Sequence, residues 1–426
     1  MILITGVNGF IGKHLFNFYK NIKGEKVLGF DKNFHLSFLD ENIEDLEFFD
    51  FVKDGRAEFI ERFLSKLEEA EDKHLKIYHL ASEVGVNFHN KTTFKSQMIL
   101  NSNIYEILLE LKHQGFKIDL AYASSSEVYG EVDDIDDIQC GQTRLLAIDR
   151  KPIFDKPERN EYILQKLFAE KLFDNLRLNS FSIQRFFNVF GYGQNSKKGF
   201  NAIIVDRIYN ENNVSSEPLI INKNSSRTYT LIDEAVVKMV DDFESNIGSE
   251  YTSVENIYGK YTVNSFDLVK CHLFIANFII ENNFKGKEYT SIMGTLLLKK
   301  IDSKNNIFDT NSVKLNYIVD DKKDEIQNRS LFSELIFTKV LPEQSKTFLL
   351  ELLKYHLLYL HKNYDKDILL HEDSKLEYLG TFIKEDDELF NDLITELDVN
   401  SNFRNLVNKI PYYELRKETI EEKISL

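Results

Sequence analysis

Residues 1–190 alternate between two patterns of apolar and polar positions. Short runs rich in β-branched and aromatic residues predict buried strands, and the stretches between them place apolar residues on one helical face. The predicted strands are Ile2–Thr5, Lys26–Asp31, Glu47–Phe51, Lys76–Ala81, Ile118–Ser124 and Phe181–Asn188. The clearest helical faces comprise Phe59, Ile60, Phe63, Leu64 and Leu67, and then Leu100, Ile104, Leu108 and Leu111. This alternation is typical of βαβ units, so we predict an α/β fold with a doubly wound parallel sheet.

The remainder of the chain predicts two further parts. Residues 191–284 form a smaller region, partly interleaved with the first, and residues 285–426 form an α-rich extension. Strand-like pieces in the extension at Tyr289–Ile301 and Ser312–Asp320 precede a helix, whose apolar face comprises Leu349, Leu352, Leu353, His356, Leu357 and Leu360. Such a face must be buried. We therefore expect the extension to pack on the smaller region or across a dimer, with His356 as a packed or hydrogen-bonded residue.

Composition narrows the class of protein. With 42% hydrophobic and 29% charged residues, the chain has ample material for a core. Its formal net charge of −16 repels phosphate backbones and anionic lipids, so neither nucleic acid nor a membrane is an expected partner. Cys140 and Cys271 lie far apart, without a CxxC or Cys/His grouping, which argues against a disulfide framework and a metal site. We expect a cytoplasmic protein without a signal peptide or membrane span.

A glycine-rich turn, TGVNGFIG at residues 5–12, follows the first predicted strand. Gly6, Gly9 and Gly12 permit a tight turn, close approach of the backbone to a pyrophosphate, and close packing of the next helix on the strand. Ordinary strand-to-helix turns also contain such glycines. The position directly after a strand at residue 2 favours a dinucleotide cradle.

Carboxylates stand at or near the ends of the next two predicted strands. Asp31 follows the glycines by about 20 residues, where a carboxylate hydrogen-bonds the adenosine ribose hydroxyls and repels a 2′-phosphate. This placement favours NAD over NADP. The alternative is that Asp31 only caps the turn into Lys32 and Asn33. Asp50, near the end of the third strand, is a candidate for an adenine contact.

Tyr162 and Lys166 are four residues apart in a predicted helix, so their side chains share one face. A tyrosine is a poor base at neutral pH unless a nearby positive charge stabilises its phenolate, and Lys166 can provide that charge. A predicted strand earlier in the chain leads into the hydroxyl-rich sequence SSSEVYG at residues 124–130. Doubly wound sheets place their ligands at such strand ends.

Taken in order, these motifs resemble one family. TGxxGxxG, Asp31, His79-Leu80-Ala81, SSSEVYG, Tyr162-xxx-Lys166 and RFFNVFG at residues 185–191 look like the NAD-dependent epimerase/dehydratase branch of the extended short-chain dehydrogenases/reductases. RTYTLIDE at residues 227–234 resembles a motif of that family's substrate domain, and the resemblance reaches to about residue 280. It implies a Rossmann-type sheet, NAD as the cofactor, a nucleotide sugar bound with the help of residues 191–284, and a homodimer.

The resemblance also implies roles for individual residues. Ser125 and Tyr162 contact the reacting hydroxyl, and Lys166 holds the nicotinamide ribose and tunes Tyr162. Glu127 completes the implied catalytic group. The implied cofactor contacts are Gly6, Gly9, Phe10, Ile11, Gly12, Asp31, Asp50, Leu80, Ala81, Asn101, Tyr162 and Lys166.

Asn188 and Arg227 are implied to face the nucleotide diphosphate of the substrate. A guanidinium can bind a diphosphate bidentately, which gives the role of Arg227 a physical basis. The alternative for Arg227 is a surface salt bridge with Glu217 or Asp233.

By resemblance, the reaction passes through a 4-keto sugar. Tyr162 takes a proton from a sugar hydroxyl as NAD accepts a hydride, and Ser125 binds the oxygen that becomes a carbonyl. Dehydratases of the family carry an acid where this chain has Ser126, which cannot act as a comparable acid. Ser126 and Glu127 instead resemble UDP-glucuronate decarboxylases, whose downstream arginine-rich segment is missing here.

Epimerisation is therefore the leading expectation, decarboxylation the second, and 4,6-dehydration less favoured. A non-catalytic scaffold that binds NAD or a nucleotide sugar is the alternative of a different class. Intact Ser125, Tyr162 and Lys166 argue against it, because such a protein has no chemical need for all three.

Overall fold

The computed structural model divides the chain into two compact units. The first comprises residues 1–187 and 232–258, and the second comprises residues 188–231 and 259–426. The structure describes residues 1–32, 45–67, 73–83, 91–129, 157–191, 194, 199–209, 219–222, 226–249, 251–259, 261–265, 268–269, 271–273, 276, 308–309, 312–313, 317–320, 328–329, 352 and 355–356.

A seven-stranded sheet forms the centre of the first unit, in the order β10-β6-β5-β4-β1-β2-β3. Every pair of neighbours is parallel, which confirms the predicted doubly wound sheet. Its strands are β1 (Ile2–Thr5), β2 (Val27–Asp31), β3 (Leu46–Phe48), β4 (His74–His79), β5 (Lys117–Ser125), β6 (Ser180–Phe186) and β10 (Thr252–Ile257).

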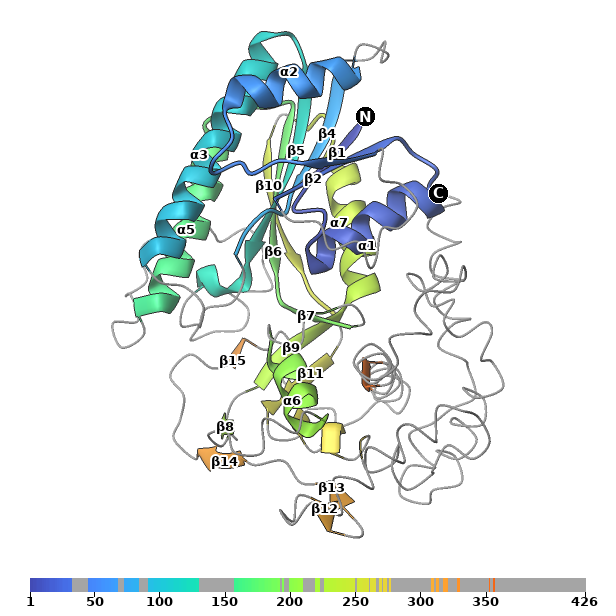
Figure 1. Ribbon diagram of the computed structural model, residues 1–426, viewed down its shortest axis with the longest axis vertical. Helices are drawn as coiled ribbons and strands as arrows, with labels where there is room; N and C mark the ends of the chain where they lie inside the picture. The colour runs from blue at the N-terminus through green and yellow to red at the C-terminus, as the bar shows by residue number, and fades with distance from the viewer. Residues whose placement is uncertain are drawn as a thin grey trace. The chain divides into compact units, whose positions relative to one another are not determined.

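Helices cover both faces of this sheet (Figure 1). One face carries α1 (Phe10–Asn17), its continuation η1 (Phe18–Ile22) and α7 (Ile232–Ser245), and the other carries α2 (Arg56–Leu67), α3 (Lys91–His113) and α5 (Pro157–Asp174). The apolar positions that the periodicity selected in α3, together with Phe59, Ile60 and Phe63 of α2, lie in one core with residues of the strands, and Leu64 packs against it. Burying an aliphatic or aromatic side chain stabilises the fold by about 1.5–3 kcal/mol, so packing holds these helices on the sheet.

The strand boundaries differ from the predicted ones at two places with a clear physical cause. β3 ends at Phe48, before the predicted end at Phe51, because Asp50 turns the chain. Its Oδ1 accepts the backbone N–H of Val52 at 3.0 Å, and its own N–H donates to Asp54 Oδ2 at 2.6 Å. The strand predicted over Phe181–Asn188 also ends early, at Phe186, because the chain enters the second unit at residue 188.

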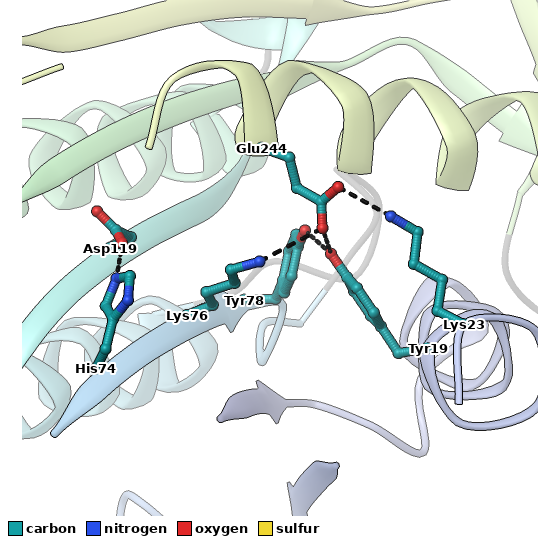
Figure 2. A network of polar contacts seen from close by, with 7 residues as sticks. All are labelled: Tyr19, Lys23, His74, Lys76, Tyr78, Asp119 and Glu244. Carbon is teal, nitrogen blue, oxygen red and sulfur yellow. Dashed lines mark hydrogen bonds and ion pairs between the residues drawn. The ribbon is translucent and has the colours of Figure 1, made fainter. Parts of the chain in front are cut away.

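A polar network fastens η1 and α7 to the sheet (Figure 2). Tyr19 donates to Glu244 Oε1 at 3.2 Å, and the hydroxyls of Tyr19 and Tyr78 lie 2.5 Å apart. Lys23 Nζ and Lys76 Nζ lie 2.9 and 3.6 Å from the same carboxylate. Burial raises the pKa of both tyrosines, so they stay neutral and keep their hydrogen bonds at physiological pH.

Among its described residues, the second unit contains short strands and a helix of ten residues. β9 (Ser226–Leu231) pairs with β7 (Asn188–Phe190), β11 (Tyr261–Asn264) and β15 (Asn328–Arg329). Two smaller ladders join β8 (Leu219–Asn222) to β14 (Tyr317–Asp320) and β12 (Phe308–Asp309) to β13 (Ser312–Val313), and α6 (Phe200–Tyr209) is the helix.

The chain crosses between the units three times. It leaves the first unit after residue 187, close to the boundary expected at 190. Residues 232–258 then return to the first unit and supply α7 and β10. The division places residues 285–426 in the second unit; the predicted strand Tyr289–Ile301 lies outside the described residues. None of the helices within the described ranges is both long enough and apolar enough to cross a bilayer.

Part of the C-terminal extension packs in the second unit through buried histidines. His356 is fully buried, as are its neighbours Leu352 and Tyr355. His356 Nε2 lies 2.8 Å from His272 Nδ1, and His272 Nε2 lies 2.9 Å from Asn201 Oδ1 on α6. His356 is thus a packed, hydrogen-bonded residue, as expected from its place on an apolar helical face. Burial lowers the pKa of His272 to about 3 and lowers that of His356 well below its usual value.

We expect the free energy of unfolding to fall as the pH drops from 7 to 5. Both histidines have a lower pKa in the folded chain than in the unfolded chain, so the unfolded chain takes up protons first. Their contribution is fully present above the unfolded pKa of about 6.5 and decreases as the pH falls toward the folded pKa. The loss at pH 5 is on the order of 2 kcal/mol for each histidine.

Thermal unfolding followed by circular dichroism between pH 5 and 8 measures this loss. His356→Gln keeps a hydrogen-bonding side chain without a titrating group, so the variant should lose less stability on acidification than the parent. His113→Gln, at an exposed position in α3, is the matched control and should leave the pH dependence unchanged. Equal pH dependence in the His356→Gln variant and the parent would contradict the assignment.

Candidate active site

The glycine-rich turn joins β1 to α1 by close contacts between backbones. Gly6 has a φ of +72°, and a Cβ added to it would lie 2.7 Å from the backbone nitrogen of Ala81. A Cβ added to Gly12 would lie 2.2 Å from the carbonyl oxygen of Gly6. Both separations are too short for real atoms, so this turn requires glycine at both positions. Leu80 and Ala81, implied as cofactor contacts, directly follow β4 beside the turn.

The first turn of α1 begins directly after Gly9. Gly9 is the N-cap residue, with extended backbone geometry and no hydrogen bond from a side chain to cap the helix, and no acidic residue stands in the first helical turn. The N–H groups at the helix start, at Phe10 and Ile11, therefore present a positive potential to an anion. The glycine cradle and this helix start together fit the pyrophosphate of a dinucleotide.

Asp31 lies at the end of β2, beside the cradle. Its Oδ2 accepts the backbone N–H of Asn8 at 3.0 Å, which links the carboxylate directly to the glycine-rich turn. Asp31 is half-buried, so part of its carboxylate remains accessible. A carboxylate held at this place fits the ribose role that its position in the sequence predicted.

A buried hydrogen-bond chain connects the ends of β1 and β4 to α3. Thr5 Oγ1 accepts the N–H of Ala81 at 3.3 Å and lies 2.7 Å from His79 Nδ1, while His79 Nε2 lies 3.1 Å from Asn101 Oδ1. Burial lowers the pKa of His79 to about 4, so the ring is neutral at pH 7. With Nε2 donating to Asn101, the neutral ring accepts a hydrogen bond from the Thr5 hydroxyl at Nδ1.

Asn101, at the end of this hydrogen-bond chain, carries a further donor group. Asn101 is buried, and its Nδ2 has no hydrogen-bond partner in the part of the chain that the structure describes. A buried amide donor without a partner costs about 1–3 kcal/mol, which a bound ligand can offset. Asn101 thereby fits its implied place among the cofactor contacts.

The end of β5 and helix α5 carry the implied catalytic group. Ser125 is the last residue of β5, and the turn η5 (Ser126–Tyr129) that follows packs Val128 against Leu167 of α5. Ser125 Oγ accepts the backbone N–H of Glu127 at 3.2 Å. Glu127 thus contacts Ser125 through its backbone, and its carboxylate is half-buried.

Lys166 joins α5 to β5. Its Nζ donates to the carbonyl oxygen of Ala123 at 2.7 Å, two residues before Ser125. The same nitrogen lies 5.9 Å from the centre of the Tyr162 ring and 5.1 Å from that of Tyr122. The structure therefore brings Tyr162 and Lys166 together and attaches them to the strand that ends in Ser125.

Burial has a strong effect on Lys166. It lowers the pKa of Lys166 to about 7, and the negative charge of Glu170 opposes this effect. The ammonium is thus close to its titration point at neutral pH, which is an uncommon state for a lysine. Perturbed lysines of this kind occur at functional sites because a small change of environment then alters their charge.

The remaining candidates lie elsewhere. Asp50 is occupied by its own turn, because its carboxylate accepts the Val52 N–H and lies 3.4 Å from Lys53 Nζ, so the adenine contact stays a prediction.

In the second unit, Asn188 of β7 is in register with Tyr229 of β9, two residues after Arg227. This register places Asn188 and Arg227 on the same face of the small sheet. Glu217, the alternative partner of Arg227, lies outside the described residues.

Sequence reasoning assigned no role to three buried polar residues next to this group. Glu170 of α5 hydrogen-bonds to both Arg185 of β6 and Ser124 of β5. A signal for them exists in the sequence, because Arg185 is the one charged residue of its predicted strand and a buried charge needs a partner. Glu170 follows Lys166 by four residues, which places it on the same helical face.

Comparison with known proteins agrees with this geometry. The chain is 26% identical over 251 residues to the ADP-L-glycero-D-manno-heptose-6-epimerase of Brachyspira hyodysenteriae, covering 55% of this chain and 70% of that protein. It is 25% identical over 298 residues to the bifunctional polymyxin resistance protein ArnA of Wigglesworthia glossinidia brevipalpis, covering 66% of this chain. The match spans 42% of ArnA, which is less than half of that protein.

A solved structure shares the fold. The UDP-N-acetylglucosamine 4-epimerase of Methanobrevibacter ruminantium M1, in complex with UDP-N-acetylmuramic acid, is 18% identical with a TM-score of 0.51. The match covers 85% of this chain and 98% of that one. The sequence profile of one family matches residues 2–248, which is more than half of the chain. The chain belongs to the NAD dependent epimerase/dehydratase family.

Proposed function

We propose that the chain is a nucleotide-sugar epimerase that works through a transient 4-keto sugar. The observation that carries this proposal is the position of Lys166. Its ammonium lies beside the Tyr162 ring and is hydrogen-bonded to β5, the strand that ends in Ser125. These are the base, its charge partner and the hydroxyl that reversible oxidation of a sugar alcohol requires.

Several residues would hold NAD. The glycine-rich turn and the start of α1 would hold the pyrophosphate, Asp31 the adenosine ribose, and the Asn101 Nδ2 donor a polar group of the cofactor. Bound NAD supplies a hydride acceptor that can return the hydride. Two features of the described residues support the fit: a cradle that a Cβ would fill, and a buried donor that has no partner.

The protein side chains manage the proton. Tyr162 takes the proton of the C4 hydroxyl, and the positive charge of Lys166 stabilises the phenolate that this requires. Ser125 accepts the Glu127 N–H on its oxygen, which leaves its own proton to donate to the sugar oxygen that becomes a carbonyl. Epimerisation follows when the hydride returns to the opposite face of that carbon.

The residue after Ser125 favours this outcome over dehydration. Ser126 is buried in η5 and offers a hydroxyl, which is too weak an acid to protonate a departing hydroxide. Decarboxylation is the second candidate, because Ser126 with Glu127 resembles the decarboxylase motif. One relative named as an epimerase supports the first choice.

For the substrate, we propose a nucleoside diphosphate sugar. Asn188 and Arg227 share one face of the sheet in the second unit, and a guanidinium beside an amide matches the acceptors of a diphosphate. The base and the sugar are left to the binding experiments below. A homodimer stays a prediction from the family resemblance.

Replacing Gly12 with alanine should weaken NAD binding at least about tenfold, which corresponds to a loss of 1.4 kcal/mol. The added methyl group would lie 2.2 Å from the Gly6 oxygen, so the cradle must change shape. Isothermal titration calorimetry measures the affinity. Gly55→Ala is the matched control, because a Cβ there meets nothing within 4 Å. Unchanged NAD affinity in Gly12→Ala would place the cofactor elsewhere.

Replacing Asp31 with serine should narrow the preference for NAD over NADP. The carboxylate binds free ribose hydroxyls and repels an added 2′-phosphate, and serine does neither in the same way. Affinities for both cofactors at one fixed salt concentration give the ratio. A parent protein that binds NADP as tightly as NAD would disprove this role of Asp31.

Incubation with UDP-, dTDP-, GDP- and CDP-sugars, followed by NMR of the products, tests the proposed reaction. We expect an epimeric sugar without net accumulation of NADH, because the hydride is returned. Tyr162→Phe should bind NAD with near-parental affinity but lose turnover, since the ring remains and the proton acceptor is gone. Release of carbon dioxide would favour decarboxylation, and loss of water would show that the inference from Ser126 is wrong. Turnover of none of these sugars would favour a scaffold.

A further inference from the structure

A buried ion pair lies next to the proposed catalytic group and has no part in the proton transfer described above. Glu170 is 1% exposed and Arg185 is fully buried. Arg185 Nη2 donates to Glu170 Oε2 at 2.8 Å, and Arg185 Nε donates to Oε1 at 3.1 Å. Both oxygens of the carboxylate are therefore engaged by one guanidinium.

Burying such a pair is expensive for a fold. Removing two charges from water costs several kcal/mol for each ion, and a well-packed apolar pair is often at least as stable. Hydrogen bonds and the charge of Glu170 outweigh burial and raise the pKa of Arg185, so the guanidinium keeps its charge. A gain in stability is therefore a weak reason for burying this ion pair, and its contacts with neighbouring residues offer a better one.

Glu170 is hydrogen-bonded to the strand that carries Ser125. Ser124 Oγ donates to Glu170 Oε1 at 2.5 Å. One helical turn earlier, Lys166 donates to the carbonyl of Ala123, the preceding residue of the strand. Two side chains of α5 thus bind two consecutive residues of β5, immediately before Ser125.

Glu170 is also the negative charge that acts on Lys166. The two residues are four apart on α5, so they share one face, and Glu170 opposes the effect of burial on the lysine. Two described neighbours of Lys166, Tyr122 and His79, carry no charge at neutral pH. Burial raises the pKa of Tyr122 and lowers that of His79, and the charge of Lys166 further lowers that of His79.

Arg185 fixes the carboxylate from a third element. It belongs to β6, where it is in register with Ser124, and its guanidinium lies 5.0 Å from the ring centre of Tyr129 in η5. Tyr129 in turn donates to Asn256 Oδ1 on β10 at 2.7 Å. Glu170 is therefore held by the sheet and cannot turn away from Lys166 without leaving its partner.

We propose that Glu170, held in place by Arg185 and Ser124, is a positioning residue that fixes Lys166 and Tyr162 relative to Ser125 and favours the charged form of Lys166. This inference rests on the proposed function for its catalytic meaning. A merely structural ion pair would contribute to stability without setting the charge of Lys166, and the two readings differ in a measurable way.

The decisive measurement is the titration of Lys166 in the protein without substrate. Lysine labelled with ¹³C at Cε gives signals whose shifts follow protonation, and the Lys166 signal is assigned by its absence in Lys166→Met. In Glu170→Gln we expect the apparent pKa of Lys166 to fall by about one unit or more, because a nearby opposite charge favours the ammonium. An unchanged titration would overturn the proposal.

Asp119→Asn is the matched control. Asp119 is a fully buried carboxylate at the other end of β5, where it accepts from Ser180 Oγ at 2.6 Å and pairs with His74 (Figure 2). The control makes the same chemical change, a buried carboxylate to an amide, at the far end of the strand to which Glu170 is hydrogen-bonded, so it should cost stability but leave the titration of Lys166 unchanged. If both variants shifted the titration equally, a general loss of packing would explain the effect and the proposal would fail.

Glu170→Asp provides a second test if Glu170→Gln does not fold. It keeps the charge but withdraws it by one methylene group, so the apparent pKa of Lys166 should fall by less than in the amide variant. On an accepted nucleotide sugar, kcat should fall at the alkaline side of the pH profile, while KM changes little. A parental pH profile together with parental Lys166 titration in Glu170→Asp would count against the proposal.

The titration also separates this inference from the proposed function. A shifted Lys166 titration in Glu170→Gln, combined with no turnover of any nucleotide sugar by the parent, would support the charge relation and contradict the proposed reaction. Turnover by the parent combined with an unshifted titration would support the proposed reaction and contradict the charge relation between Glu170 and Lys166.

Discussion

The parallel register of β1, β4, β5 and β6 is the constraint on which the rest of the site depends. Thr5 is in register with His79, and Ser125 with Phe186, so the carboxyl ends of the strands meet along one edge of the sheet. The glycine-rich turn, Ala81 and Ser125 belong to or follow these strand ends, and Asp31 ends β2, the parallel neighbour of β1. Side chains far apart in the sequence reach one edge because the strands are parallel, which is the general reason why doubly wound sheets bind ligands there.

Two different kinds of link hold that edge. The chain through Thr5, His79 and Asn101 is neutral, because burial and the charge of Lys166 keep His79 unprotonated. The link through Glu170 and Arg185 is ionic. The neutral state of His79 affects the charges around Lys166. A protonated His79 would add a second cation near Lys166, whereas the neutral ring does not, so the charge of Lys166 is not opposed by His79.

Local patterns in the sequence predicted the elements of the first unit well, because burial of an amphipathic helix or a strand leaves a periodic trace. They did not predict β10, because its place beside β6 depends on the return of residues 232–258 from the second unit. Glu170 looks like one more charge on a helix rich in charges, and only packing against β6 reveals its burial. Asp50 was assigned to adenine from its place after a strand, while the structure shows its carboxylate ending that strand. The implied roles of Ser125, Glu127, Tyr162, Asn188 and Arg227 rest on placement and resemblance, which geometry alone does not test.

The C-terminal extension enters the argument through the second unit. β15, from the extension, pairs with β9 so that Arg329 is in register with Arg227, and the His356 hydrogen bond reaches His272 and through it Asn201 of α6. The extension thus contributes backbone to the sheet that carries Arg227 and a buried side chain to the helix layer of the same unit. A sheet edge that is paired in this way has fewer exposed backbone groups than an open one. Changes in β15 can therefore alter the surroundings of Arg227 through the backbone pairing of β15 with β9.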